Sequence, residues 1–316
     1  MEVLITTPSF GQQSTKPWEA LEALEYQVRR PSGQHPLSGT QLAQEIGNSE
    51  ALIVGLDVVD AEVFSSATNL KVVAKHGVGV DNIDCAAAVA AGVTVVNAPG
   101  SNSGAVADLT LGLILALARQ ILPADASTRA GHWERFPGIE LSGRTLGLIG
   151  LGRIGQAVVQ RARAFGMEVI AYDPFLPTEI FHSLAVKQVS LEECIAGADV
   201  LSLHMPGNAD EKPLLSKEAL VTMKDGALLV NAARGGLVDE EALAEHLRSG
   251  RLAGAALDAF SSEPLSTTSA LRDLPNVILT PHIGAFTDLA NAAMGVTVVE
   301  DIARVLQGGQ PVNKVA

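Results

Sequence analysis

Cysteine is nearly absent from this sequence of 316 residues, and so is any long apolar run. The two cysteines, Cys85 and Cys194, lie far apart and match neither a disulfide framework nor the Cys/His spacing of a metal site. We therefore expect a reducing compartment and no bound metal. The most apolar continuous segment, 109–118, is about half as long as the ~20 residues that a membrane span needs, so we expect no membrane partner.

Basic residues are also few. The chain has 22 Lys and Arg against 35 Asp and Glu, a formal net charge of −13, and the basic residues are scattered. Binding to the phosphate backbone of a nucleic acid needs a basic face, so we expect no nucleic-acid partner. The N-terminus begins with a strand-like segment rather than a charged region followed by a long apolar one. Because this differs from a secretory signal, we predict a cytoplasmic protein.

Apolar residues, in contrast, make up 47% of the chain. A chain of this length exceeds the usual size of one core, so we expect two domains. Short apolar runs alternate with amphipathic segments, which predicts an α/β fold with parallel sheets covered by helices. Strand-like and helix-like segments before residue 97 are 3–6, 18–24, 41–46, 51–54, 61–66, 71–74, 86–90 and 93–96. Further strands are predicted at 200–204, 227–231, 253–259 and 277–280.

One stretch organises the chain: residues 146–159 have the pattern of a short buried strand, a glycine turn and a helix. Gly150 permits the tight turn, Gly152 lets backbone N–H groups approach a pyrophosphate, and Gly155 lets the helix pack closely on the sheet. Asp173 follows the next apolar run at roughly the ~20-residue spacing expected of an acid that binds the ribose hydroxyls. Its charge repels a 2′-phosphate, so we predict NAD rather than NADP. The alternative is a glycine turn without a ligand.

Two long helices are expected outside these runs. The first spans about 104–122, and its middle is apolar nearly all round, which indicates a helix buried between domains or subunits. An extended connection over 129–142 then leads to the glycine stretch. The second helix, 288–306, could return to the first domain.

A second glycine-rich turn, residues 75–84, follows a predicted strand. Backbone N–H groups in such a loop can hold a carboxylate, because glycine allows close approach. A plain connection between a strand and a helix is the alternative.

Three polar residues, Arg234, Glu263 and His282, come just after predicted strands. In open α/β sheets ligands bind beyond the carboxyl ends of the strands, which is the edge that also carries the glycine turn. An Arg fork binds a carboxylate, a His exchanges a proton near neutral pH, and a neighbouring carboxylate orients the imidazole. Together they suit hydride transfer between nicotinamide and a 2-hydroxy/2-oxo acid. Taken singly, they could be a surface Arg, a helix-capping Glu and a loop His.

These motifs resemble those of the D-2-hydroxyacid dehydrogenase family in order and spacing. The motifs that carry this resemblance are 150–155, 231–239, 258–264 and 281–285. Two others, 76–84 and 97–102, are similar to the D-3-phosphoglycerate dehydrogenase-like branch. The resemblance covers nearly the whole chain.

The resemblance implies a catalytic set of Arg234, Glu263 and His282, in which Arg234 and His282 also bind substrate. It further implies backbone groups of Val78 and Gly79 near the substrate carboxylate. We add Lys75 and Asn102 to the predicted substrate residues. Beyond the three glycines, the implied cofactor contacts are Arg153, Ile154, Asp173, His204, Pro206, Ala232, Asp258 and Gly284. Among these, Asp258 would hold the nicotinamide carboxamide.

The resemblance also implies a discontinuous architecture with two Rossmann-like domains. Residues 1–96 and 287–316 would form a flavodoxin-like substrate domain, and residues 97–286 a doubly wound NAD domain. Members of the family are usually dimers joined through the NAD domain, which would explain the apolar helix. The sequence ends at Ala316, so we expect no C-terminal regulatory domain.

Two departures affect the choice of substrate. The segment 204–211 lacks the two threonines that often follow the family's His-x-Pro motif, and residues 55–57, Gly-Leu-Asp, stand where phosphoglycerate-specific relatives often carry Arg-Ser. Lys75 is close to the glycine loop and could replace that cation. We predict an NAD-dependent dehydrogenase for a small D-2-hydroxy acid, with 3-phosphoglycerate as one candidate. Hydroxypyruvate or glyoxylate reduction is the rival activity, and a non-catalytic NADH-sensing protein is the alternative from another class.

Overall fold

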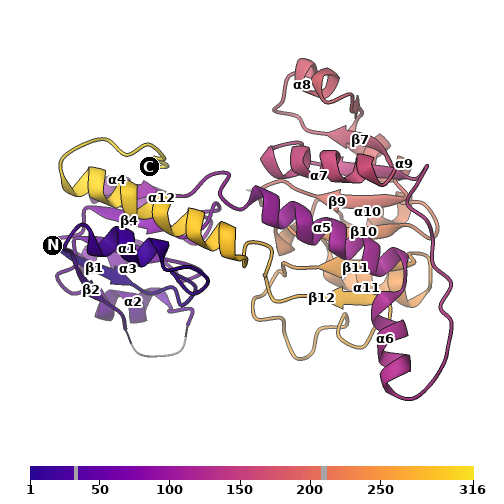
Figure 1. The fold of residues 1–316 in the computed structure, drawn as a ribbon, viewed down its shortest axis with the longest axis horizontal. Coiled ribbons are helices and arrows are strands. Elements are labelled where there is room, and N and C mark those ends of the chain that lie inside the picture. The colour runs from indigo at the N-terminus through magenta and orange to yellow at the C-terminus, as the bar shows by residue number, and fades with distance from the viewer. Residues whose placement is uncertain (32–34, 208–211) are drawn as a thin grey trace. The chain divides into compact units, whose positions relative to one another are not determined.

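A computed structural model describes residues 1–31, 35–207 and 212–316. They form two compact units (Figure 1). Unit 1 comprises Met1–Asn102 and Ala285–Ala316, and unit 2 comprises Ser103–Gly284. The boundaries expected from the sequence, after residues 96 and 286, lie close to these divisions. The separate roles assigned to the two parts stay a prediction.

Unit 1 contains a parallel five-stranded sheet with the order β2-β1-β3-β4-β5. The strands are β1 (Glu2–Ile5), β2 (Gln27–Arg29), β3 (Ala51–Val54), β4 (Val72–Lys75) and β5 (Thr94–Val96). This is the flavodoxin-like order, in which the chain reverses direction across the sheet between β1 and β3. Both β3 and β4 are buried along their whole length, as expected of strands covered on both faces.

Helices cover this sheet. They are α1 (Lys16–Glu22), α2 (Gly39–Glu45), α3 (Ala61–Ser66), α4 (Cys85–Ala90) and α12 (Asp288–Leu306). The C-terminal helix α12 packs against α1, β4 and β5, so the end of the chain joins the fold of its beginning (Figure 1). Asp301 is fully buried on α12 and accepts hydrogen bonds from the N–H groups of Val312 and Asn313, which fixes the last residues of the chain.

Unit 2 contains a parallel seven-stranded sheet with the order β12-β11-β10-β9-β6-β7-β8. Its strands are β6 (Thr145–Ile149), β7 (Glu168–Tyr172), β8 (Lys187–Gln188), β9 (Val200–Leu203), β10 (Leu228–Asn231), β11 (Gly254–Leu257) and β12 (Val277–Leu279). The chain reverses direction across the sheet between β6 and β9, as in a doubly wound Rossmann fold. The predicted α/β class with two parallel sheets is therefore confirmed.

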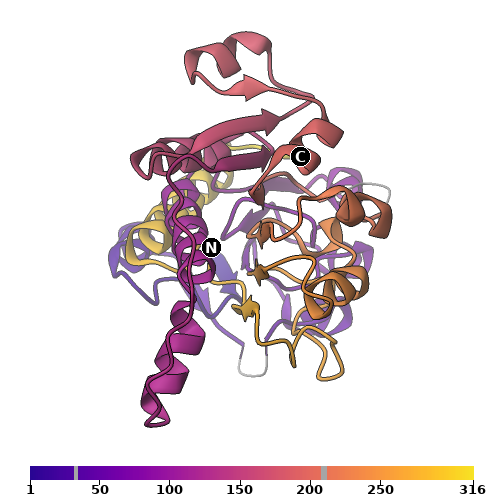
Figure 2. The same cartoon turned by 90° about the vertical axis from the view of Figure 1, so that its right-hand side faces the viewer.

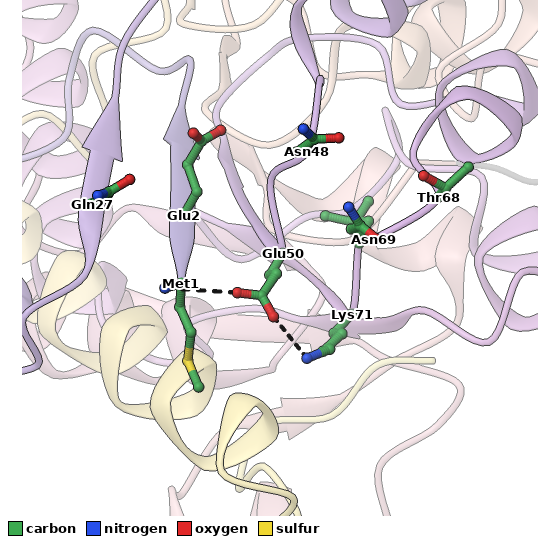
Figure 3. Close-up of a pocket in the computed structure, with 9 residues that line it drawn as sticks. Met1, Glu2, Gln27, Asn48, Glu50, Thr68, Asn69 and Lys71 are labelled. Atoms are coloured by element: carbon green, nitrogen blue, oxygen red, sulfur yellow. Dashed lines mark hydrogen bonds and ion pairs between the residues drawn. The ribbon is translucent and has the colours of Figure 1, made fainter.

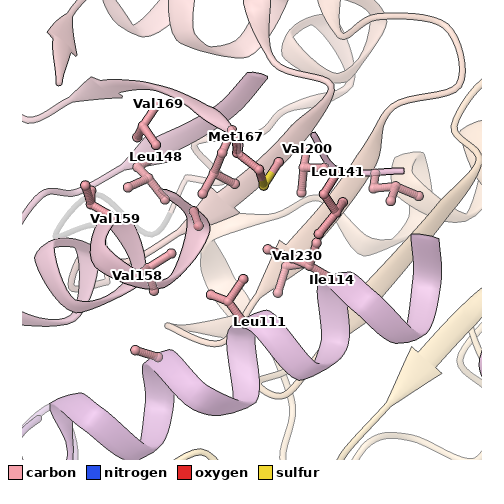
Figure 4. Close-up of a cluster of buried hydrophobic side chains, with 14 of the residues drawn as sticks. Leu111, Ile114, Leu141, Leu148, Val158, Val159, Met167, Val169, Val200 and Val230 are labelled. Carbon is pink, nitrogen blue, oxygen red and sulfur yellow. The ribbon is translucent and has the colours of Figure 1, made fainter. Parts of the chain in front are cut away.

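Both faces of this sheet are covered by apolar clusters. One cluster lies under α5 (Ser103–Ala118), α7 (Arg153–Ala164) and α8 (Thr178–Ser183). In Figure 4, Leu111 and Ile114 of α5 point toward Val230 of the sheet. The other cluster lies under α9 (Leu191–Gly197), α10 (Lys217–Thr222) and α11 (Glu240–Arg248). A short 3-10 helix, η1 (Gly235–Leu237), precedes α11.

The long helix expected over 104–122 is two helices, so that prediction was wrong. Helix α5 ends at Ala118, and α6 (Ile121–Arg129) begins after Gln120, whose φ of +52° is left-handed and breaks the helix. Helix α6 has no buried residue and projects from unit 2 (Figure 1, Figure 2).

Within the described residues no single helix has the length and apolar character to cross a membrane. Helices α5 and α6 pass that test only as a pair bent by 63°.

Candidate active site

The glycine turn lies at the point where the sheet of unit 2 reverses direction. Gly150 follows β6 with a φ of +97°, and a Cβ there would lie 2.6 Å from the carbonyl oxygen of His204, which follows β9. The ends of these two neighbouring strands therefore touch through Gly150. A Cβ on Gly155 would lie 2.4 Å from the carbonyl oxygen of Gly150, so only glycine lets α7 begin this close to the turn.

The N-terminus of α7 is open in a way that fits a phosphate. Gly152 is its N-cap residue and makes no side-chain capping hydrogen bond, and a Cβ there would meet nothing within 4 Å. Helix N-termini carry N–H groups without intrahelical partners and a partial positive charge, which together favour an anion. Arg153 is exposed on the first turn, and Ile154 beside it is partly buried.

Asp173 connects the glycine turn to the end of β7. Its Oδ2 accepts the N–H of Leu151 at 2.8 Å, and its Oδ1 accepts the N–H of Phe175 at 3.0 Å. A carboxylate has about four acceptor positions, so both oxygens keep capacity for the hydroxyls of a ribose.

His204 is a neutral imidazole at the same edge of the sheet. Burial lowers its pKa to about 4, and its Nε2 lies 2.9 Å from the Ser202 hydroxyl. Its Nδ1 is buried and has no hydrogen-bond partner among the residues described. Pro206 is exposed two residues later, and a Cβ on Gly207 would lie 3.8 Å from Cγ of Arg234. Residues 208–211, part of the altered segment 204–211, lie outside the described residues.

His282 and Glu263 form a hydrogen-bonded pair. The His282 Nδ1 lies 2.8 Å from Oε2 and 3.0 Å from Oε1 of Glu263, and the two side chains are 36% and 26% exposed. Burial alone would raise the pKa of Glu263. The hydrogen bond and charge of His282, the N–H of Phe260 and the charge of Arg234 outweigh burial and hold that pKa below its usual value. The pair therefore contains an ionised carboxylate at neutral pH.

Arg234 is held by its own loop. The Asn231 side chain at the end of β10 donates to the Arg234 carbonyl at 2.8 Å and accepts the N–H of Ala233 at 3.1 Å. A Cβ on Gly235 would lie 1.7 Å from the carbonyl carbon of Phe260, so glycine lets this loop contact the turn that leads to Glu263. The loop thus fixes Arg234 close enough to Glu263 for its charge to act on that carboxylate.

Three other predicted cofactor residues lie on this edge. Ala232 is partly buried just after β10, and Gly284 is buried just after β12. Asp258 follows β11 and is 2% exposed, and it accepts the N–H of Gly284 at 2.8 Å. All the predicted cofactor and catalytic residues therefore belong to unit 2.

The predicted substrate residues Lys75, Val78, Gly79 and Asn102 belong to unit 1. The amine of Lys75 points at two neighbouring loops of unit 1. It donates to the Gly55 carbonyl, and to Asn82 Oδ1 at 2.7 Å. The Val78 carbonyl accepts from Asn97, and Asn102 has a buried Oδ1 with no partner in the described part of the chain.

The sequence did not single out the loop after β1. Thr7, Ser9 and His76 form a hydrogen-bonded series: the Thr7 and Ser9 hydroxyls lie 2.9 Å apart, and Ser9 Oγ lies 3.2 Å from His76 Nδ1. A Cβ on Gly55 would lie 2.5 Å from Thr7 Oγ1, so this loop touches the one after β3. The loops flank the reversal point of unit 1, where ligands of such sheets bind. The only signal in the sequence was their position after short strands.

A pocket on the opposite edge of unit 1 is a weaker candidate. It lies before β1, β2, β3 and β4 and is lined by Met1, Glu2, Glu50, Lys71 and their neighbours (Figure 3). The two acids are already paired: Glu50 accepts from Lys71 at 2.8 Å, and Glu2 accepts from Ser49 at 2.6 Å. Ligands of parallel sheets bind at the carboxyl edge, which argues against this pocket as the site of chemistry.

Across residues 1–31, 35–207 and 212–316, no cluster of three or more His, Cys, Asp or Glu side chains could hold a metal ion.

The chain is similar to known proteins in both sequence and fold. Residues 111–284 match the family model described as "D-isomer specific 2-hydroxyacid dehydrogenase, NAD binding domain". This match lies within unit 2 and includes the glycine turn, Arg234, Glu263 and His282.

Among curated proteins, the chain is 47% identical over 276 residues to the D-3-phosphoglycerate dehydrogenase of Methanocaldococcus jannaschii. That alignment covers 86% of this chain but 52% of the relative, so the chain spans about half the length of this relative. The hydroxypyruvate reductase of Thermotoga maritima is 42% identical, with 85% of this chain and 89% of that protein covered. Among solved structures, the TT0316 protein of Thermus thermophilus is 40% identical and superimposes with a TM-score of 0.89, with 100% of both chains covered.

Proposed function

The chain belongs to the D-isomer specific 2-hydroxyacid dehydrogenase family, and on that premise we propose that it is an NAD-dependent dehydrogenase of a small D-2-hydroxy acid. The observation that carries the proposal is the hydrogen-bonded pair of His282 and Glu263 with the charge of Arg234 beside it. These groups lie on the sheet edge that also holds the open N-terminus of α7.

Each side chain has a distinct role in the proposed reaction. Arg234 binds the substrate carboxylate with its guanidinium fork and polarises the neighbouring carbonyl. His282 donates a proton to the oxygen of the 2-oxo acid, or takes it from the hydroxyl in the reverse direction. Glu263 keeps the imidazole oriented and stabilises its charged form, because its own carboxylate is ionised. NAD supplies the hydride donor or acceptor when it is bound.

The nucleotide would be held by the edge of unit 2. Its pyrophosphate fits the open helix end at Gly152, and Asp173 would bind the ribose hydroxyls and repel a 2′-phosphate. Asp258, Ala232, Pro206 and the residues near them would complete the contacts. Within unit 1, Val78 and Gly79 stay proposed substrate residues.

Two classes of substrate are candidates: a phosphorylated and an unphosphorylated acid. The name of the relative from M. jannaschii favours 3-phosphoglycerate. The segment after β3 favours an unphosphorylated acid such as hydroxypyruvate or glyoxylate, because Leu56 is 51% exposed there and the carboxylate of Asp57 is buried beside it. Phosphate recognition favours a cation whose N–H donors point at the phosphate, whereas Lys75 is 7% exposed and donates to neighbouring loops.

Initial rates of NADH oxidation test this function. Phosphohydroxypyruvate, hydroxypyruvate, glyoxylate and pyruvate are compared, with NADPH as a parallel donor. We expect turnover of at least one acid, with NADH preferred, and we expect Leu56→Arg to raise the relative rate with phosphohydroxypyruvate. Tight NADH binding with no turnover of any acid would favour the NADH-sensing alternative.

We also infer a homodimer that acts in the cytoplasm. Helix α6 has no buried residue, and Ile121, Leu122 and Trp133 around it are 50%, 47% and 82% exposed. An apolar projection of this kind favours burial against a second copy. The two cysteines are free thiols, in keeping with a reducing compartment. Sedimentation of Trp133→Ser beside the wild-type protein tests the dimer: a larger monomer fraction is expected, and an unchanged distribution would contradict this interface.

A further inference from the structure

The carboxylate of Asp258 accepts hydrogen bonds from residues on both sides of His282. Its Oδ1 accepts the Thr280 hydroxyl at 2.6 Å and the Ile283 N–H at 2.8 Å. Its Oδ2 accepts the Gly284 N–H at 2.8 Å. The three donors come from residues before and after His282 in the sequence. The imidazole of His282 is itself hydrogen-bonded to Glu263.

The turn held in this way has an unusual conformation. His282 has a φ of +53°, in the left-handed region that residues with a Cβ seldom adopt. Its N–H donates to the Thr280 carbonyl at 2.9 Å. Successive N–H groups next to a left-handed residue form a concave site for an anion, and here the anion is the side chain of Asp258.

Because Asp258 is buried, its carboxylate depends on these hydrogen bonds. Asp258 is 2% exposed, and a buried carboxylate is tolerated only when hydrogen bonds satisfy it. Hydrogen bonds to an ionised group are stronger than those between neutral groups. The carboxylate therefore opposes any relaxation of His282 toward an ordinary backbone conformation, which would move the imidazole away from Glu263.

We propose that Asp258 is a positioning residue that acts through His282: it fixes the left-handed turn from which the imidazole reaches Glu263. This role rests on the proposed dehydrogenase function and adds to the cofactor contact that the family resemblance implies for Asp258. A carboxylate has about four acceptor positions, and three are used by the turn. A substitution distinguishes the two roles. Loss of the positioning role changes the orientation of the His282 imidazole, whereas loss of the cofactor contact changes nucleotide binding.

The substitution Thr280→Val tests the proposal by removing one donor at nearly constant volume. We expect kcat to fall by ~2–10-fold, the range for loss of one hydrogen bond, while the Kd for NADH stays unchanged. Thr280→Ser keeps the hydroxyl and should restore the rate. Thr222→Val, at an exposed helix position whose hydroxyl bonds its own helix, is the matched control and should have no effect.

A second background shows whether the effect passes through His282. In His282→Gln the residual rate should change less than about twofold on adding Thr280→Val, because coupled residues are not additive. The same fold-loss in both backgrounds, or a rise in the Kd for NADH equal to the loss of rate, would overturn the proposal and assign Asp258 to the cofactor. Thermal unfolding of each variant checks that the fold is kept.

A spectroscopic measurement separates this proposal from the proposed function. If the wild-type protein reduces no 2-oxo acid, the dehydrogenase function fails, but the imidazole ¹⁵N resonances of His282 still report its hydrogen bond to Glu263. They are assigned by their loss in His282→Gln. Thr280→Val and Asp258→Asn should shift them toward their positions in Glu263→Gln, and unchanged resonances would overturn the positioning role.

Discussion

At the scale of single residues, the proposed chemistry depends on one ionised carboxylate beside one imidazole. Glu263 is half-buried, and its pKa stays low because His282, the Phe260 N–H and Arg234 stabilise its charge. A carboxylate that accepts from Nδ1 leaves Nε2 of the same ring to exchange a proton with substrate. The carboxylate is thus the group to change first.

The substitution Glu263→Gln keeps the size of the side chain and removes its charge. We expect kcat to fall by ~10²-fold or more, the lower range for a general acid–base contribution, while the Kd for NADH is unchanged. Steady-state kinetics and NADH fluorescence measure the two quantities. Glu245→Gln, in an exposed ion pair with Lys217, is the control. A rate close to wild type for Glu263→Gln would show that the pair is structural.

At the scale of elements, two glycines at the start of α7 differ in the space around them. A Cβ at Gly155 would collide with the Gly150 carbonyl at 2.4 Å, whereas a Cβ at Gly152 meets nothing within 4 Å. At Gly155 the protein's own backbone fills the space that a side chain would take. At Gly152 that space is open, and the helix end has no side-chain cap.

Gly155→Ala and Gly152→Ala should therefore fail in different ways. We expect Gly155→Ala to lower the free energy of unfolding by ~1–3 kcal/mol, as overpacking does. Gly152→Ala should leave unfolding nearly unchanged and raise the Kd for NADH, because the methyl group enters the proposed phosphate site. Denaturant unfolding and NADH titration measure both. In Gly112→Ala, on α5 with open space around it, both quantities should stay within error or show slight stabilisation. Equal NADH affinity in Gly152→Ala and wild type would contradict this location of the phosphate.

At the scale of the whole molecule, each unit buries one neutral histidine. Burial lowers the pKa of His76 in unit 1 and of His204 in unit 2 from 6.5 to about 4, and the charge of Lys75 adds to the effect at His76. In the unfolded chain both imidazoles take up protons below about pH 6.5. The unfolded state therefore binds more protons between pH 6.5 and about 4, so stability is lost as the pH falls through this window.

Replacing His76 should reduce the loss of folding stability at low pH. Each histidine contributes up to ~3 kcal/mol between neutral pH and pH 4, from a shift of roughly two and a half units. Urea unfolding followed by the fluorescence of Trp18, which packs edge-on against Phe10 next to His76, reports unit 1. His76→Asn should lose less stability from pH 7 to pH 4 than the wild type, whatever its stability at pH 7. His132→Asn, at an exposed position, should keep the full loss. Parallel curves for wild type and His76→Asn would contradict the buried neutral state.

The sequence predicted the elements that local pattern decides. The predicted segments 51–54 and 61–66 coincide with β3 and α3, because uniform apolar character and the N-cap Asp60 define their ends. Strand β2 was missed, since Gln27–Arg29 is an exposed polar edge whose pairing depends on β1. The break at Gln120 was missed because nothing in its side chain requires a left-handed backbone.

The same distinction holds for the candidate site. The placement of Arg234, Glu263 and His282 at one edge of the sheet could be predicted from their positions after strands, because all strands of the sheet run parallel; their catalytic roles stay a prediction. The hydrogen bonds of Asp258 to Thr280, Ile283 and Gly284 could not, since they follow from the left-handed turn at His282. Likewise, the contact between Ser9, in the loop after β1, and His76 could not be predicted, because it depends on the pairing of strands in the folded sheet.

The most direct test of the proposed chemistry follows the hydride itself. NADH carrying deuterium at the transferred C4 position is incubated with the protein and hydroxypyruvate or phosphohydroxypyruvate, and the product is analysed by mass spectrometry and chiral separation. We predict deuterium at C2 of the D-hydroxy acid, with formation at least ~10²-fold slower in His282→Gln at an unchanged Kd for NADH. An L product, a D product without deuterium, or equal rates in both proteins would contradict the assignment of Arg234, Glu263 and His282 as the catalytic set.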